Sequence, residues 1–76
     1  MRELHITVEF KDQERLVDSY KWDVCDEFPE VLLTQKAVKS IIPGMISVWG
    51  AKNCYVHYPI DEIFKIETIL YYDESP

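Results

Sequence analysis

The chain has 76 residues, of which 47% are hydrophobic and 13% aromatic, and its formal net charge is −6. A chain of this length is the size of a single domain, residues 1–76, and its apolar content is too high for a disordered protein. The negative charge disfavours bare nucleic acid and anionic membrane surfaces as ligands, because both of them attract a basic face.

The distribution of apolar residues and cysteines indicates a cytoplasmic protein. No apolar run approaches the length that crosses a bilayer, and the first residues lack the apolar core of a signal peptide. Two cysteines, Cys25 and Cys54, are too few for the disulfide framework of a small secreted protein. We therefore expect free thiols, a cytoplasmic location and no membrane association.

The first part of the chain predicts a β-hairpin. Residues 3–10 alternate between polar and apolar side chains, and the apolar positions are Leu4, Ile6, Val8 and Phe10. This period of two is typical of a half-buried strand. Residues 11–14 form a polar turn, and residues 16–25 alternate again, with Tyr20, Trp22 and Val24 opposed by Ser19, Lys21 and Asp23. The two strands are expected to pair antiparallel.

Residues 26–42 predict a helix with Asp26 as its cap and Pro29 in its first turn. Leu33, Ala37 and Ile41 follow one another at a spacing of four, as in an amphipathic helix. Val31, Val38 and Ile42 widen this stripe. The alternative is a strand at residues 31–34, because β-branched residues are frequent here.

The remaining chain predicts three strands. The first lies between Gly44 and Gly50, the second spans 54–58 and ends at Pro59, and the third spans 64–72. Residues 60–63 are expected to form a turn or a 3₁₀ turn, and residues 73–76 a frayed tail. On the last strand, Phe64, Ile66, Leu70 and Tyr72 are expected to share one face.

The order of these elements, β-β-α-β-β-β, predicts an α+β fold in which one helix packs on an antiparallel sheet of about five strands. If residues 31–42 are extended instead, the expected fold is a small all-β barrel of the SH3-like kind.

The sequence contains no signature of an enzyme or of a cofactor site. Its two glycines are too few for a phosphate-binding loop, and no nucleophile or zinc-protease motif occurs. Cys54 and His57 are three apart, so on a strand they point to opposite faces and cannot share a metal ion. We therefore expect a non-enzymatic protein without catalytic residues, cofactor or metal.

Charge is segregated along the chain. Residues 9–30 carry eight acids and three bases, residues 31–60 three lysines and no acid, and residues 61–76 five acids and one base. If the first hairpin and the last strand lie side by side, their acids can merge into one anionic surface that attracts a basic partner. The candidate partner-binding residues are Asp12, Glu14, Asp18, Asp23, Asp26, Glu27, Glu30, Asp61, Glu62 and Glu67.

In size, composition and charge pattern, the whole chain resembles the small acidic phage-encoded proteins that inhibit host DNA-binding proteins by mimicking DNA. The resemblance implies an inhibitor in the host cytoplasm that occupies a basic, nucleic-acid-binding surface. Its expected partner is a nucleoid protein, RNA polymerase, or a restriction or CRISPR nuclease, and it does not bind nucleic acid itself.

Besides the DNA-mimic inhibitor, a second hypothesis for the function is a structural or assembly module. Such a module pairs through an exposed sheet edge with itself or with another chain. A homodimer is expected, since an open sheet leaves edge strands that self-pairing satisfies.

Overall fold

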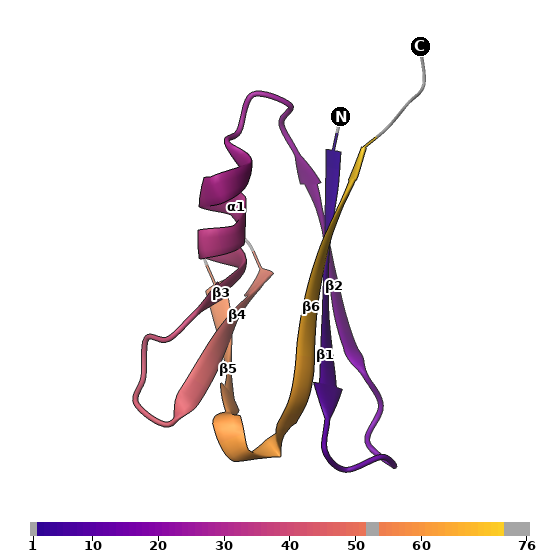
Figure 1. Ribbon diagram of the computed structural model, residues 1–76, viewed down its shortest axis with the longest axis vertical. Helices are drawn as coiled ribbons and strands as arrows, with labels where there is room; N and C mark the ends of the chain where they lie inside the picture. Colours follow the sequence, from indigo (N-terminus) through magenta and orange to yellow (C-terminus); the bar gives the residue numbers. More distant parts are fainter. Residues whose placement is uncertain (1, 52–53, 73–76) are drawn as a thin grey trace.

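The computed structural model describes residues 2–51 and 54–72, which form two three-stranded antiparallel sheets and one α-helix (Figure 1). The elements are β1 (Arg2–Phe10), β2 (Asp18–Val24), α1 (Glu30–Ala37), β3 (Val38–Lys39), β4 (Met45–Ala51), β5 (Cys54–Pro59), the 3₁₀ helix η1 (Ile60–Glu62) and β6 (Ile63–Tyr72). Sheet A has the strand order β2-β1-β6, and sheet B has the order β3-β4-β5.

The α+β class predicted from the sequence is confirmed, and so are the antiparallel pairings. The single sheet of about five strands is wrong, because β3, β4 and β5 form a second sheet, whereas β6 returns to pair with β1 in the first. The alternative barrel is also wrong, since both sheets are open. The cause is local: β3, β4 and β5 follow one another with short connections, so each pairs with its neighbour in the sequence.

The first hairpin forms as predicted, and β1 is the central strand of sheet A. Leu4, Ile6, Val8 and Phe10 are buried, and the residues between them are only half-buried. Across the ladder, Leu4 lies opposite Trp22 in β2 and opposite Leu70 in β6. The alternation of β1 therefore directs its apolar residues into the core between the two sheets.

The helix is shorter than the predicted range of 26–42. It begins after Pro29, which occupies the N-cap position without a side-chain cap, so Asp26 is not the cap. It ends at Ala37, because Val38 adopts extended backbone angles and pairs with Val48. Of the predicted apolar stripe, Leu33 and Ala37 are buried, whereas Val31, Ile41 and Ile42 are exposed.

The physical reason for the early end of α1 is the turn that follows. The amide of Met45 donates to the carbonyl of Ile42 at 3.1 Å, and Gly44 between them has φ = 78°. Pro43 before a glycine with positive φ is typical of a type II turn, which reverses the chain. The segment 38–42 therefore enters a β-hairpin, a conformation that its β-branched residues prefer to a helix.

The last strand carries a bulge that the sequence did not predict. Glu9 lies opposite Lys65, but Phe10 lies opposite Ile63, so the register shifts and Phe64 has no partner in the ladder. Ile63 takes the inward position, and Phe64 is 70% exposed instead of sharing the face of Ile66 and Leu70. The predicted tail at residues 73–76 lies outside the described residues.

The two sheets are joined along β2 by buried polar contacts. Tyr58 in β5 donates its hydroxyl to Asp18 at 2.7 Å and accepts from the hydroxyl of Tyr20 at 2.5 Å. Burial, together with these two neighbours, raises the pKa of Tyr58 far above its usual value, so the hydroxyl stays protonated and remains a donor. The rings of Trp22 and Trp49 stack with centroids 4.8 Å apart.

The close approach of the sheets at this side also requires a glycine. A Cβ atom at Gly50 would lie 2.6 Å from the side chain of Val56 and 3.2 Å from the ring of Tyr20. The indole N–H of Trp22 donates to the carbonyl of Trp49, the residue before Gly50, at 3.1 Å. Sheet A and sheet B are therefore in contact along β2, whereas on the other side α1 and β6 face each other across a groove.

The Tyr58→Phe variant should lower the free energy of unfolding by about 1–3 kcal/mol, because it leaves Asp18 and Tyr20 without a buried partner. Urea unfolding followed by tryptophan fluorescence measures this change. Tyr71→Phe is the matched control, since Tyr71 is exposed and its hydroxyl forms no hydrogen bond with a described residue. It should change stability by less than about 0.5 kcal/mol. Equal losses in the two variants would show that the hydroxyl network does not join the sheets.

Candidate functional site

The strongest candidate for a catalytic pair is Ser47 with His57, but their hydrogen bond serves to hold two strands together. The Ser47 hydroxyl lies 2.6 Å from Nδ1 of His57, directly across β4 and β5. Ser47 is fully buried, so a substrate cannot reach its oxygen. Among residues 2–51 and 54–72, no three histidine, cysteine or acidic side chains are grouped closely enough to hold a metal ion.

The predicted partner-binding acids do not form one surface. One group lies where the β1–β2 loop meets η1, at the lower end of the view in Figure 1. The amide of Lys11 donates to the carbonyl of Glu62 at 3.0 Å, and Arg15 lies 3.6 Å from the Glu62 carboxylate. These contacts bring together a lower acidic cluster of Asp12, Glu14, Asp61 and Glu62, all exposed.

A second group lies at the opposite end of the long axis, where β2 leads into α1 (Figure 1). This upper acidic cluster consists of Asp23, Asp26, Glu27 and Glu30, and all four residues are exposed. Arg2 holds the connection in place, because its buried guanidinium donates to the carbonyls of Cys25 and Phe28. The molecule extends 43 Å along this axis, so the two clusters are separate sites.

The remaining two predicted residues are engaged by neighbours. Asp18 accepts the hydroxyl of Tyr58 inside the molecule. Glu67, on the outer face of sheet A, lies 2.9 Å from the ammonium of Lys65, and this hydrogen bond raises the pKa of Lys65. On the same face, a hydrogen bond from His5 lowers the pKa of Glu3, which also pairs with Lys21 at 3.5 Å. Three acids of this face, Glu3, Glu9 and Glu67, are therefore paired with Lys21 and Lys65.

Two lysines of the central segment, Lys36 and Lys39, lie on aromatic rings. The ammonium of Lys36 is 5.7 Å from the ring of Phe28 and 5.6 Å from that of Trp49. That of Lys39 is 5.4 Å from the ring of Tyr55. Cation–π contact of this kind satisfies part of the charge, so these lysines stabilise the packing of α1 and sheet B.

The longest strand, β6, pairs through one edge only. Its partner is β1, and no other strand in the described part of the chain pairs with its second edge. Exposed apolar side chains accompany this edge: Ile69 is 38% exposed, and Tyr72 is 56% exposed. An unpaired strand edge presents a row of backbone donors and acceptors that another strand can complete.

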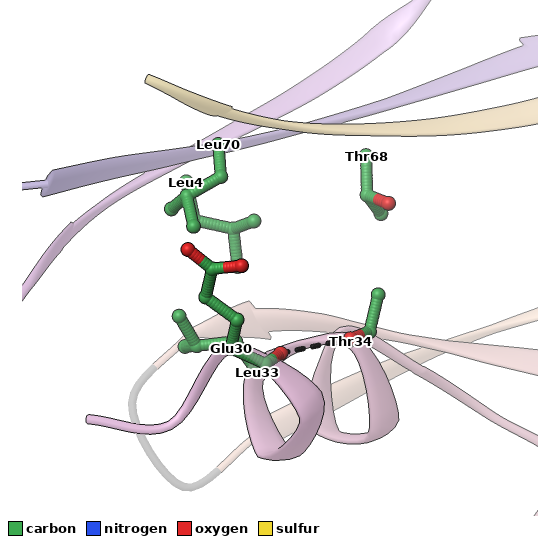
Figure 2. Close-up of a pocket in the computed structure, with 6 residues that line it drawn as sticks. All are labelled: Leu4, Glu30, Leu33, Thr34, Thr68 and Leu70. Carbon is green, nitrogen blue, oxygen red and sulfur yellow. Dashed lines mark hydrogen bonds between the residues drawn. The ribbon is translucent and has the colours of Figure 1, made fainter. Parts of the chain in front are cut away.

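A groove lies beside this edge, between α1 and the inner face of sheet A (Figure 2). It encloses about 140 Å³ and is lined by Leu4, Glu30, Leu33, Thr34, Thr68 and Leu70. Of these residues, sequence reasoning selected Glu30 alone, as one acid among many. The groove forms because α1 lies opposite β6, and no local sequence pattern predicts that arrangement.

Comparisons of this chain with protein-family models, with curated proteins and with solved structures found no match. The resemblance to DNA mimics therefore rests on composition and charge pattern alone. No helix within the described residues has the length and apolar character that crossing a membrane requires. The function must be argued from the surfaces described above.

Both cysteines are free, as the sequence predicts, and both are exposed. Cys25 follows the last residue of β2, and Cys54 begins β5. The native protein should therefore take up two equivalents of a thiol reagent without reductant or denaturant, as measured by intact mass. Labelling that needs denaturant would show that one thiol is buried, and labelling that needs reductant would show a disulfide.

Proposed function

We propose that this chain is a non-enzymatic binding module that pairs the free edge of β6 with an extended strand of a partner protein. The observation that carries the proposal is the second edge of β6, which no described strand occupies although β6 spans ten residues. Such edge pairing gives affinity through main-chain hydrogen bonds and specificity through alternate side chains.

The upper part of β6 lacks the features that protect edge strands from pairing. Natural edges are blunted by lysine, proline, bulges or short length. In β6, Lys65 and the bulge at Phe64 lie near its start, and residues 66–72 contain no base, no proline and the single acid Glu67. This segment is therefore open to an incoming strand.

The other edge in sheet A suits an incoming strand less well, because β2 spans seven residues and carries Asp18, Lys21 and Asp23. The inner side of β2 is held against sheet B by Tyr20 and Trp22, which bond to Tyr58 and Trp49. In sheet B, β5 spans only six residues and ends in Pro59, which has no amide hydrogen to donate. Of these edges, β6 is the one whose length and side chains suit a partner.

Placing lysines on the edge should abolish this pairing. The Ile69→Lys, Tyr72→Lys double variant adds two charges beside the β6 backbone, and both side chains are exposed, so the fold should persist. Immobilised wild type and variant are compared for capture of proteins from an extract of the cells that encode the chain, at low and high salt. Partners that remain bound to the wild type at high salt should be lost from the variant.

The matched control is the Leu16→Lys, Ile41→Lys double variant, which adds the same charge at exposed positions in the β1–β2 loop and in the loop before β4. It should capture the same partners as the wild type. If both double variants bind alike, the edge of β6 is not the binding surface.

A second candidate function is the acidic inhibitor of a nucleic-acid-binding protein. The observation that favours it is the exposure of the upper and lower acidic clusters at the two ends of a molecule that extends 43 Å. Because the two clusters lie at opposite ends of the molecule, they can contact two separate phosphate-binding places on a basic protein.

The inhibitor function is tested by competition. Charge reversal at Glu14, Asp23, Glu27 and Asp61, which are exposed members of the two clusters, leaves the core untouched. The wild type should displace a short labelled duplex from a basic nucleoid protein, and displacement should weaken steeply between about 50 and 200 mM salt. The quadruple variant should fail to displace it. Equal displacement by both proteins would exclude acidic mimicry.

A further inference from the structure

The groove beside α1 is placed to receive side chains of a strand that pairs with β6. Thr68 and Leu70, which line the groove, belong to β6 and point to the inner face of sheet A. A strand added to the free edge continues sheet A, and its side chains lie about 4.5–5.5 Å from the opposite residues of β6 on the same face. Its inward side chains therefore extend beside Thr68 and Leu70, toward α1.

The apolar part of the groove lining consists of three leucines. Leu4 and Leu33 are buried, Leu70 is half-buried, and the three come from β1, α1 and β6. The enclosed volume of about 140 Å³ is close to the roughly 150 Å³ of an engineered leucine-lined cavity that holds a benzene ring. The groove is thus large enough for one long side chain whose stem is apolar.

One end of the groove is anionic. Figure 2 shows the carboxylate of Glu30 extending from α1 across the groove toward Leu4 and Leu70. Glu30 makes no ion pair with a described residue, and the guanidinium of Arg2 is directed instead at two backbone carbonyls. The hydroxyl of Thr34 already donates to the Glu30 carbonyl at 2.8 Å, whereas that of Thr68 bonds to no described residue.

We infer that the groove receives the side chain of a lysine or arginine from the strand that pairs with β6. This inference rests on the proposed edge pairing and names the residue that the partner presents. The aliphatic stem of lysine or arginine packs along the three leucines, and its cationic head reaches Glu30 and Thr68. A carboxylate in the same place is repelled by Glu30, and an aliphatic side chain covers the Glu30 carboxylate without a partner for it.

A second copy of the chain does not meet this requirement. The inward residues of β6 are Ile63, Ile66, Thr68, Leu70 and Tyr72, and none of them is cationic. Two copies also carry a net charge of −6 each, which opposes their association. The partner that fits is an extended basic segment of a different protein.

Three blocked peptides test the inference. Each alternates valine and threonine, and its central valine is replaced by lysine, norleucine or glutamate. Binding to the ¹⁵N-labelled protein is followed by amide chemical shifts. The lysine peptide should shift amides of α1 and β6 and bind about five- to tenfold more tightly than the glutamate peptide, with norleucine between them.

Two protein variants test whether Glu30 causes the preference for lysine over glutamate. Glu30→Gln should reduce the preference for lysine over glutamate to less than about twofold, because the charge that attracts the ammonium is gone. Glu27→Gln removes an equal charge from a neighbouring exposed position outside the groove and should leave the preference unchanged. Unchanged spectra of the free variants establish that both are folded.

N-methylated peptides test the edge pairing separately from the groove inference. Strand pairing uses the N–H groups of alternate residues, so of two lysine peptides N-methylated on opposite sets of amides, one should bind and the other should not. Equal binding of both would overturn the edge pairing and the groove inference together. Selective loss of one, without a preference for lysine that depends on Glu30, would overturn the groove inference alone.

Two further results would overturn the inference. If the free protein shows concentration-dependent shifts along β6, a second copy occupies the edge. If none of the peptides shifts the amides of α1 and β6, the groove does not receive a partner strand.

Discussion

The hydrogen-bonded group of Asp18, Tyr20 and Tyr58 is the constraint on which the arrangement of the two sheets depends. It joins β2 to β5 through a buried hydroxyl, and the adjacent stack of Trp22 on Trp49 continues the contact toward β4. A domain of this size has few such contacts to distribute, since small domains bury a limited share of their surface. Closing the sheets along β2 leaves the other side open, where α1 covers part of the core and β6 keeps an unpaired edge.

Exposed and paired charges also occupy different parts of the molecule. Acids at the two ends of the long axis are exposed, whereas those on the outer face of sheet A are mostly bonded to lysine or histidine. Lys36 and Lys39, two lysines of the acid-free segment, lie on aromatic rings around α1 and sheet B. The groove beside β6 is an exception, because Glu30 lies there among leucines without a cation from the described residues. Backbone groups, an apolar wall and one free charge therefore meet at a single place.

These features favour recognition over chemistry. The pair of buried Ser47 and exposed His57 and the hydroxyl network of Tyr58 stabilise strand and sheet contacts, and neither lines the groove. A strand edge provides main-chain hydrogen bonds to any extended segment, whereas a side pocket with one charge selects among such segments. In the proposed binding function the two properties are complementary, because the edge would provide affinity and the groove the choice of partner.

The sequence alone determined the elements whose signals are local. The alternation of β1 specified its buried face, Gly44 and Pro59 marked the start of β4 and the end of β5, and charge segregation was visible by counting. The tertiary structure decided the rest. Val38 is in a strand and not in the predicted helix, because it pairs with Val48. Phe64 does not share the predicted inner face, because the register between β1 and β6 shifts at Phe10. Periodicity reports which side chains share a face, but the choice of pairing partner is made between segments far apart in the chain. The free edge of β6 and the groove beside it result from these strand pairings, and for that reason no sequence motif predicts them.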